Sequence, residues 1–199
     1  MKGDIRTHPD VDEQTGARTP CAGRMARLRA SIPKGVELGL DLAPDLPLIE
    51  ADPAQLQQVV MNLVINAAEA IGENAPGKVE IRTSLREFNA GEAAEFFGPE
   101  QVAADGAYIQ LAVTDTGSGM DEATKARIFD PFFTTKFTGR GLGLAAVQGI
   151  LRGHNGAIRV YSTPGQGTSF LILLPAKHRK IAVKSRERRR VLRIPPDGS

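Results

Sequence analysis

Apolar and polar positions alternate with two different periods along the chain, and these periods predict its strands and helices. A period of two predicts a strand, whereas apolar positions three and four apart predict a helix. The segments with strand period are 36–42, 78–88 and 107–115, and those with helical spacing are 53–71, 121–129 and 142–155. The segments 157–163 and 167–175 are predicted to form a closing hairpin of two further strands. In chain order they predict a two-layer α/β sandwich, in which about three helices cover a mixed, mostly antiparallel sheet.

The helix predicted over 53–71 has clear end signals and an unusual polar stripe. Asp52 is a candidate N-cap, Pro53 suits the first helical position, and Gly72 ends the pattern. The stripe borders the apolar face and consists of Gln55, Gln58, Asn62, Asn66 and Glu69. Solvent exposure is the simplest explanation of such a stripe. However, Asn is a poor helix former, so two Asn spaced four apart indicate that amide oxygens are needed there.

A magnesium ion is one ligand that would need such oxygens. Magnesium prefers oxygen ligands, retains several waters, and commonly binds through few protein groups plus substrate phosphates. Asn66 would supply one oxygen without adding negative charge beside a triphosphate.

The segment VTDTGSGM, residues 113–120, ends a predicted strand and carries candidate base-binding chemistry. The carboxylate of Asp115 can accept a hydrogen bond from an exocyclic amine such as that of adenine. Gly117 and Gly119 permit positive φ and close backbone approach to a ligand. An ordinary turn is the simpler explanation of this segment when it is taken alone.

Two later segments add candidate phosphate and hydroxyl chemistry. GRGLGL, residues 139–144, leads directly into a predicted helix, whose N–H groups and dipole can meet a phosphate. PGQGTSF, residues 164–170, offers Thr168 as a hydroxyl donor, although it also fits a plain hairpin turn. Each glycine-rich turn is weak evidence by itself.

Length and composition indicate one domain with short tails. The 199 residues contain no apolar run near the roughly 20 residues needed to cross a bilayer, and the start has no apolar core of the secretory type. The single cysteine, Cys21, excludes an internal disulfide framework and suits a reducing compartment. We therefore expect a cytoplasmic protein with no membrane segment in this chain.

Charge is distributed unevenly along the chain, with an excess of positive charge at its ends and of negative charge in its middle. Residues 177–199 carry nine Lys and Arg against two Asp and Glu, whereas residues 30–176 carry ten against seventeen. Since no aromatic residues lie between the cations of the tail, we expect a solvated, disordered tail and no nucleic-acid partner. Residues 1–24 are polar without periodicity, which favours disorder or a short linker.

Taken together, five ordered segments resemble the boxes that define the ATP-binding domain of sensor histidine kinases. QVVMNLVINAAEAI resembles the asparagine box, DTGSGM the first glycine box, DPFFTTK the phenylalanine box, and GRGLGL and GQGTSF the two later glycine boxes. The resemblance covers about residues 30–175. It implies the Bergerat ATP-binding fold, which is shared with gyrase, mismatch-repair and heat-shock chaperone ATPases, and it implies ATP and Mg²⁺ as cofactors.

The resemblance also implies roles for residues that match its motifs. Asp115 would recognise adenine, Gly117 and Gly119 would shape the base pocket, and Thr168 would lie near the base. Asn66 would be the magnesium ligand.

On the phosphate side, the resemblance implies that Gly141, Leu142 and Gly143 wrap the phosphates. Lys136 and Arg140 would lie on a lid loop, where cationic groups can neutralise β- and γ-phosphate charge.

Three further residues complete the site that the resemblance implies. Phe132 and Phe133 would anchor the lid loop against the domain without touching ATP. Glu69 would order metal-bound water, or would simply be a solvated carboxylate on the last helical turn.

Asn62 bears on the type of reaction. In the related hydrolases this position resembles one at which a glutamate activates water, and an amide cannot act as a general base at neutral pH. Slow attack by water favours a kinase over an ATPase, with Asn62 and Lys136 in supporting roles.

A phosphoacceptor histidine is not evident. His8, His154 and His178 do not resemble the family's phosphoacceptor box, and we expect a surface or capping role for His154. The segment RMARLRAS, residues 24–31, resembles a remnant of the dimerisation hairpin, so that residues 1–29 would be a disordered segment or part of such a helix.

We therefore expect a catalytic domain over residues 30–176 that acts with partners in trans. Those partners would be a histidine-bearing dimerisation domain and a response regulator, and the isolated chain would not autophosphorylate. One alternative is a nucleotide-binding regulatory or truncated module without productive transfer. Another is a serine kinase of the anti-sigma type, which the long segment DPFFTTKFTGRGLGL disfavours.

Overall fold

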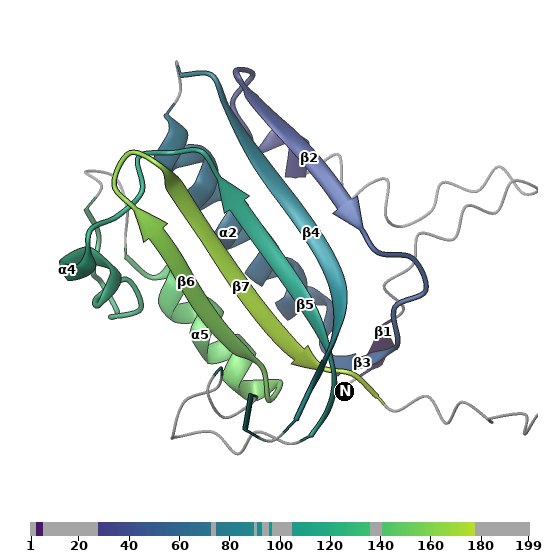
Figure 1. Ribbon diagram of the computed structural model, residues 1–199. Helices are drawn as coiled ribbons and strands as arrows, with labels where there is room; N and C mark the ends of the chain where they lie inside the picture. The colour runs from purple at the N-terminus through teal and green to yellow at the C-terminus, as the bar shows by residue number, and fades with distance from the viewer. Residues whose placement is uncertain are drawn as a thin grey trace, which may run out of the picture.

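The computed structural model describes residues 3–5, 28–72, 75–89, 91–92, 96, 105–135 and 141–177, and its centre is a five-stranded sheet. The strands are β2 (Val36–Leu42), β4 (Gly77–Phe88), β5 (Gly106–Asp115), β6 (Ala157–Thr163) and β7 (Gly167–Pro175). They lie in the order β2-β4-β5-β7-β6, as Figure 1 shows. β2 pairs with β4 in parallel, and the other neighbours pair antiparallel. The predicted mixed, mostly antiparallel sheet is therefore confirmed.

Helices α2 (Pro53–Ile71) and α5 (Gly143–Gly153) lie side by side on one face of the sheet, which gives the predicted two layers (Figure 1). The core lies between these layers. Its fully buried members include Leu63, Val79, Val147, Leu151 and Ile172. The described helices include none long and apolar enough to cross a membrane.

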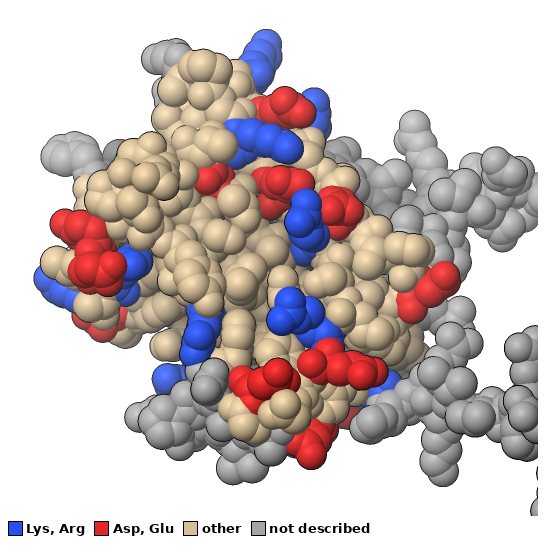
Figure 2. All heavy atoms as spheres, viewed as in Figure 1, with Lys and Arg blue, Asp and Glu red and all other residues tan. Residues whose placement is uncertain are grey.

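The opposite face of the sheet carries charges of both signs, which lie beside one another in Figure 2. Arg82 on β4 lies 2.7 Å from the Asp41 carboxylate on β2 and 3.5 Å from the Glu80 carboxylate. Exposed pairs of this kind add little stability. They are consistent with a face that is solvated over β2 and β4.

The start and end of α2 follow the local sequence signals. Oδ1 of Asp52 accepts hydrogen bonds from the N–H groups of Ala54 and Gln55 at 2.8 and 3.2 Å, and Pro53 occupies the first turn. Gly72 ends the helix with a φ of +93°. In the polar stripe, Asn62 and Asn66 are half-buried, whereas Gln55, Gln58 and Glu69 are exposed.

Two short strands were not predicted. β3 (Ile49–Ala51) pairs antiparallel with β1 (Gly3–Ile5), which falls in the segment expected to be disordered or a linker. Three residues are too few to show a period of two, which explains why the sequence pattern missed both strands. Residues 28–30 form a helical turn with Leu28 buried; the rest of 1–27 and the basic tail from 178 lie outside the described residues.

The helix predicted over 121–129 is shorter in the structure. α4 is Glu122–Lys125, and it is capped by the Asp121 side chain. The side-chain and backbone hydrogen bonds from Thr124 hold the pKa of Asp121 below its ordinary value. Beyond α4, the N–H groups of Arg127 and Asp130 bond to carbonyls three residues earlier, so the chain continues as turns. Pro131 disfavours a helical conformation at the residue before it.

Replacing Asp52 by Ala is expected to destabilise the protein by about 1 kcal/mol, because two N–H groups of α2 lose their acceptor. Urea denaturation followed by circular dichroism measures this change. Asp52→Asn is the matched control, since its amide oxygen can accept the same bonds. Equal free energies of unfolding for Asp52→Ala and the parent protein would contradict the capping role.

Candidate nucleotide-binding site

The carboxylate of Asp115 is buried at the end of β5, where two backbone segments donate hydrogen bonds to it. Its Oδ1 accepts from the N–H of Gly117 at 2.8 Å and from the N–H of Thr168 at 3.2 Å. Only 3% of Asp115 is exposed. Burial of a carboxylate is costly unless such donors compensate for its lost hydration. The two bonds therefore fix both the carboxylate and the loop that follows it.

The glycines after Asp115 are required by close contacts between backbone segments. A Cβ on Gly117 would lie 2.6 Å from the carbonyl carbon of Ala70, at the end of α2. Gly119 has a φ of +64°, and a Cβ there would collide with the carbonyl oxygen of Thr163. These glycines thus allow the loop to pack between α2 and the β6–β7 hairpin, a function that the sequence pattern did not reveal.

Three polar side chains form one row across β5, β7 and β6. The strand register pairs Asp115 with Thr168 and Thr168 with Ser162. The hydroxyl oxygens of Ser162 and Thr168 are 2.9 Å apart. Ser162 was not among the predicted site residues, although counting outward from the 164–166 turn would have placed it opposite Thr168.

The amide of Asn62 lies against the first turn of α5. Its Nδ2 donates to the carbonyl of Gly143 at 3.2 Å. Leu142, the N-cap residue of α5, makes no side-chain capping bond, and Gly141 before it has a φ of +65°. The first N–H groups of a helix lack partners within the helix and attract anions. This turn therefore has the chemistry that a phosphate group needs.

Two side chains whose oxygen atoms could contact a metal ion, Asn66 and Glu69, lie on the last turns of α2. Asn66 is half-buried one turn after Asn62, and Glu69 is exposed. Within the described ranges, no group of three or more His, Cys, Asp and Glu side chains could hold a metal ion. This donor set does not suit a cage made of protein ligands alone. It suits a magnesium ion that takes most of its oxygens from phosphates and water.

The two phenylalanines of the DPFFTTK segment differ in their contacts. Phe133 packs against the core, and the Arg127 guanidinium lies 4.4 Å from its ring centroid. Phe132 is 75% exposed, and its N–H donates to the Gly141 carbonyl at 2.9 Å. The prediction that both rings act as anchors is correct for Phe133 and wrong for Phe132, whose backbone makes the connection. The predicted residues Lys136 and Arg140 lie outside the described residues.

His154 is buried between the ends of two helices, so the expected surface position is wrong. The alternative expectation, a capping role, is confirmed, because His154 is the C-cap residue of α5. Its Nε2 accepts from the N–H of Asp52 at 3.0 Å, and its Nδ1 lies 2.7 Å from the Ile150 carbonyl. With Nε2 as an acceptor, the neutral ring carries its proton on Nδ1 and donates it. Both nitrogens are therefore engaged. His8 and His178 lie outside the described residues.

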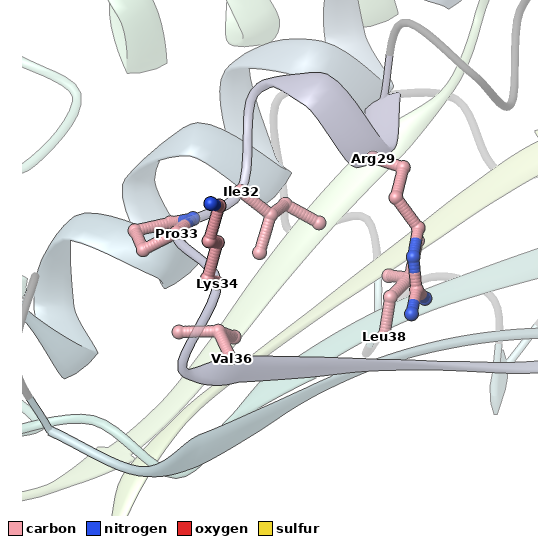
Figure 3. Close-up of a pocket in the computed structure, with 6 residues that line it drawn as sticks. All are labelled: Arg29, Ile32, Pro33, Lys34, Val36 and Leu38. Atoms are coloured by element: carbon pink, nitrogen blue, oxygen red, sulfur yellow. The ribbon is translucent and has the colours of Figure 1, made fainter.

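A cavity of about 230 Å³ lies elsewhere, between the turn at 28–30 and β2 (Figure 3). Its lining consists of Arg29, Ile32, Pro33, Lys34, Val36 and Leu38. None of the predicted site residues is among them, so this cavity is separate from the site around Asp115.

Comparison with known proteins shows the family to which the chain belongs. Residues 51–178 match the family model described as histidine kinase-, DNA gyrase B-, and HSP90-like ATPase. The chain is 38% identical over 169 residues to the sensor kinase CckA of Brucella abortus, covering 84% of this chain and 17% of that protein. It is 38% identical over 146 residues to the histidine-protein kinase AtoS of Escherichia coli, covering 73% of this chain and 21% of AtoS. The chain thus spans about a fifth of the length of these relatives.

Solved structures of histidine kinases share the fold. The catalytic domain of histidine kinase ThkA has a TM-score of 0.56 and 28% identity, covering 78% of this chain and 86% of that one. Full-length ShkA in complex with AMPPNP has a TM-score of 0.58 and 27% identity, covering 80% of this chain and 31% of ShkA. The fold, the five ordered motifs and these relatives together place the chain in the histidine kinase-, DNA gyrase B- and HSP90-like ATPase family, with sensor histidine kinases as its relatives.

Proposed function

We propose that this chain binds ATP with magnesium and transfers the γ-phosphate to a protein histidine supplied from outside the domain. It would act as the catalytic domain of a two-component sensor histidine kinase. The observation that carries the proposal is the arrangement at one end of the sheet. A buried carboxylate, Asp115, lies beside the glycine loop, and the uncapped first turn of α5 lies against Asn62. The base and the phosphates of one nucleotide need these two kinds of group.

Each proposed contact follows from the chemistry of its residue. Asp115 accepts a hydrogen bond from the adenine amine, and Thr168 lies next to it across the β5–β7 pair. The backbone of Gly141–Gly143 receives the phosphates at the start of α5. Lys136 and Arg140, which precede Gly141 in the sequence, would add positive charge for the phosphates. The full-length ShkA structure contains AMPPNP, which supports a nucleotide in this kind of domain.

Magnesium fits the donor set on α2. Asn66 would hold it with one amide oxygen, with Glu69 beside its water shell. When bound, the ion would neutralise part of the negative charge of the phosphates.

The side chain of Asn62 favours transfer of the phosphoryl group to a protein over hydrolysis of ATP. Its amide cannot remove a proton from water at neutral pH, so water remains a poor nucleophile. The acceptor histidine would belong to a dimerisation domain, and a response regulator would receive the phosphoryl group afterwards. Because ATP is the phosphate donor, we expect this reaction in the cytoplasm. Residues 30–176 would form the catalytic domain, between an N-terminal segment and a basic tail.

Replacing Asn66 by Ala is expected to weaken magnesium-dependent binding of a fluorescent ATP analogue about tenfold, which corresponds to about 1.4 kcal/mol. The reason is the loss of the metal's amide oxygen. Gln58→Ala is the matched control, because Gln58 is exposed on the same stripe of α2. Titrations with and without magnesium measure the effect. Equal affinity in the parent protein and Asn66→Ala under both conditions would exclude the metal-ligand role.

Replacing Asp115 by Asn is expected to weaken ATP binding by about 2–4 kcal/mol, because a buried charge-assisted hydrogen bond to the adenine amine is lost. GTP, which has a carbonyl at the corresponding position, should compete poorly in the parent protein. Competition titrations with both nucleotides test the assignment. If GTP competes as well as ATP, Asp115 does not recognise the base.

The isolated chain is expected to remain unlabelled after incubation with γ-labelled ATP, and phosphate release should be slow. His154 is buried at the far end of α5, roughly 15 Å from its first turn if each residue adds about 1.5 Å. Transfer requires a nucleophile close to in line with the γ-phosphate.

Adding a separate histidine-bearing dimerisation hairpin should produce acid-labile label on the hairpin. Transfer should be weak, because no covalent linkage raises the local concentration of the acceptor. Asp115→Asn, which is expected to bind ATP weakly, is the control that shows how much label appears on the hairpin without bound nucleotide. Acid-labile label on this chain alone would contradict the proposal, and tight ATP binding without transfer to any hairpin would favour a regulatory module.

A further inference from the structure

The hydroxyl group of Ser162 uses its full hydrogen-bonding capacity beside the proposed base site. Ser162 Oγ accepts from the N–H of Met120 at 2.8 Å. It donates to the carbonyl of Gly167 at 3.1 Å and lies 2.9 Å from Thr168 Oγ1. A hydroxyl has one proton and two acceptor positions. The three partners of Ser162 Oγ therefore use its proton and both of its acceptor positions.

This arrangement determines which of the two hydroxyls donates to the other. The Gly167 carbonyl carries no proton, so the single proton of Ser162 must point toward it. The 2.9 Å contact can then form only if Thr168 donates its proton to Ser162. The Thr168 hydroxyl can therefore offer only its lone pairs to a ligand. It acts toward a ligand as an acceptor and not as the donor that the sequence indicated.

We propose that Ser162 is a positioning residue for base recognition, because it takes the proton of Thr168 and leaves an acceptor beside the Asp115 carboxylate. This inference rests on the proposed function, in which this end of the sheet receives the base. Asp115, Thr168 and Ser162 lie in one register row across β5, β7 and β6. Asp115 is 3% exposed and Thr168 is 5% exposed, so bulk water does not supply alternative donors freely.

Two neighbouring acceptors select an amine over a carbonyl. The exocyclic amine of adenine can donate to both, whereas a carbonyl at the same ring position places its lone pairs against theirs. Unpaired or repelled polar groups in a buried site are costly, which makes such a pocket discriminating. Ser162 therefore contributes to specificity without touching the nucleotide.

Comparing ATP with inosine triphosphate tests this role, because the latter carries a carbonyl in place of the amine. In Ser162→Ala the proton of Thr168 is released and can point toward the carbonyl. We expect the preference for ATP over inosine triphosphate to fall roughly three- to tenfold, the size of one hydrogen bond. The loss of the Met120 partner disturbs the loop for both nucleotides alike, so the ratio of the two affinities is the readout.

A double-mutant cycle shows whether Ser162 acts through Thr168. Thr168→Val removes the lone pairs, so ATP should bind more weakly, whereas inosine triphosphate should bind no more weakly than to the parent protein because the repulsion of its carbonyl is relieved. Adding Ser162→Ala to Thr168→Val should change the ratio no further. Ser169→Ala is the matched control, since it removes a neighbouring hydroxyl on β7 that lies 2.9 Å from Thr114 Oγ1, and its ratio should equal that of the parent protein.

The outcomes separate this inference from the proposed function. Equal losses of affinity for both nucleotides in Ser162→Ala would overturn the positioning role and leave ATP binding standing. If circular dichroism shows that Ser162→Ala does not fold, Thr168→Val decides: weaker ATP alone supports the inference, and equal weakening of both nucleotides overturns it. Failure of the parent protein to bind ATP would overturn the proposed function itself.

Discussion

Asp115 carries its carboxylate at a place with almost no access to water, and the backbone around it is arranged to supply donors. Two N–H groups, from the loop after β5 and from the start of β7, reach the same oxygen. This requires the two segments to approach closely. A Cβ at Gly167 would collide with the Asp115 carbonyl, and Gly117 is packed against the last turn of α2. The glycine pattern is thus a consequence of satisfying a buried charge, and the proposed base site exists because that charge is held there.

The elements with a regular pattern could be predicted from the sequence because their signals are local. Asp52, Pro53 and Gly72 act within one or two turns of the ends of α2, and the short turn at 164–166 separates the two apolar strand segments of the β6–β7 hairpin. The parallel pairing of β2 with β4 has a different origin. A helix that connects two strands of one sheet usually returns the chain in the same direction, as α2 does here. The order of elements therefore carried information that alternation alone did not.

The features that could not be predicted depend on contacts between distant parts of the chain. The burial of His154 depends on the N–H of Asp52, which is 102 residues away in sequence. Ser162 acquires its importance from a hairpin register and from Met120, 42 residues earlier. A pattern of residue types shows which groups are present, but a polar side chain becomes part of a site only through its partners. Phe132 illustrates the opposite case, since its apolar side chain is exposed and its backbone makes the contact with Gly141.

Helices α2 and α5 are connected by hydrogen bonds at two places along their antiparallel contact. At one end the N–H of Asp52 donates to His154, and further along Asn62 donates to Gly143. Two separated attachment points restrict sliding and rotation of one helix against the other, which a single bond would not. Asn66 lies one turn beyond the second attachment, so its distance from the first turn of α5 is constrained by the same pair of bonds. The groups proposed for the metal and the phosphates are in this way positioned by helix packing, whereas the groups proposed for the base are positioned by the register of the sheet.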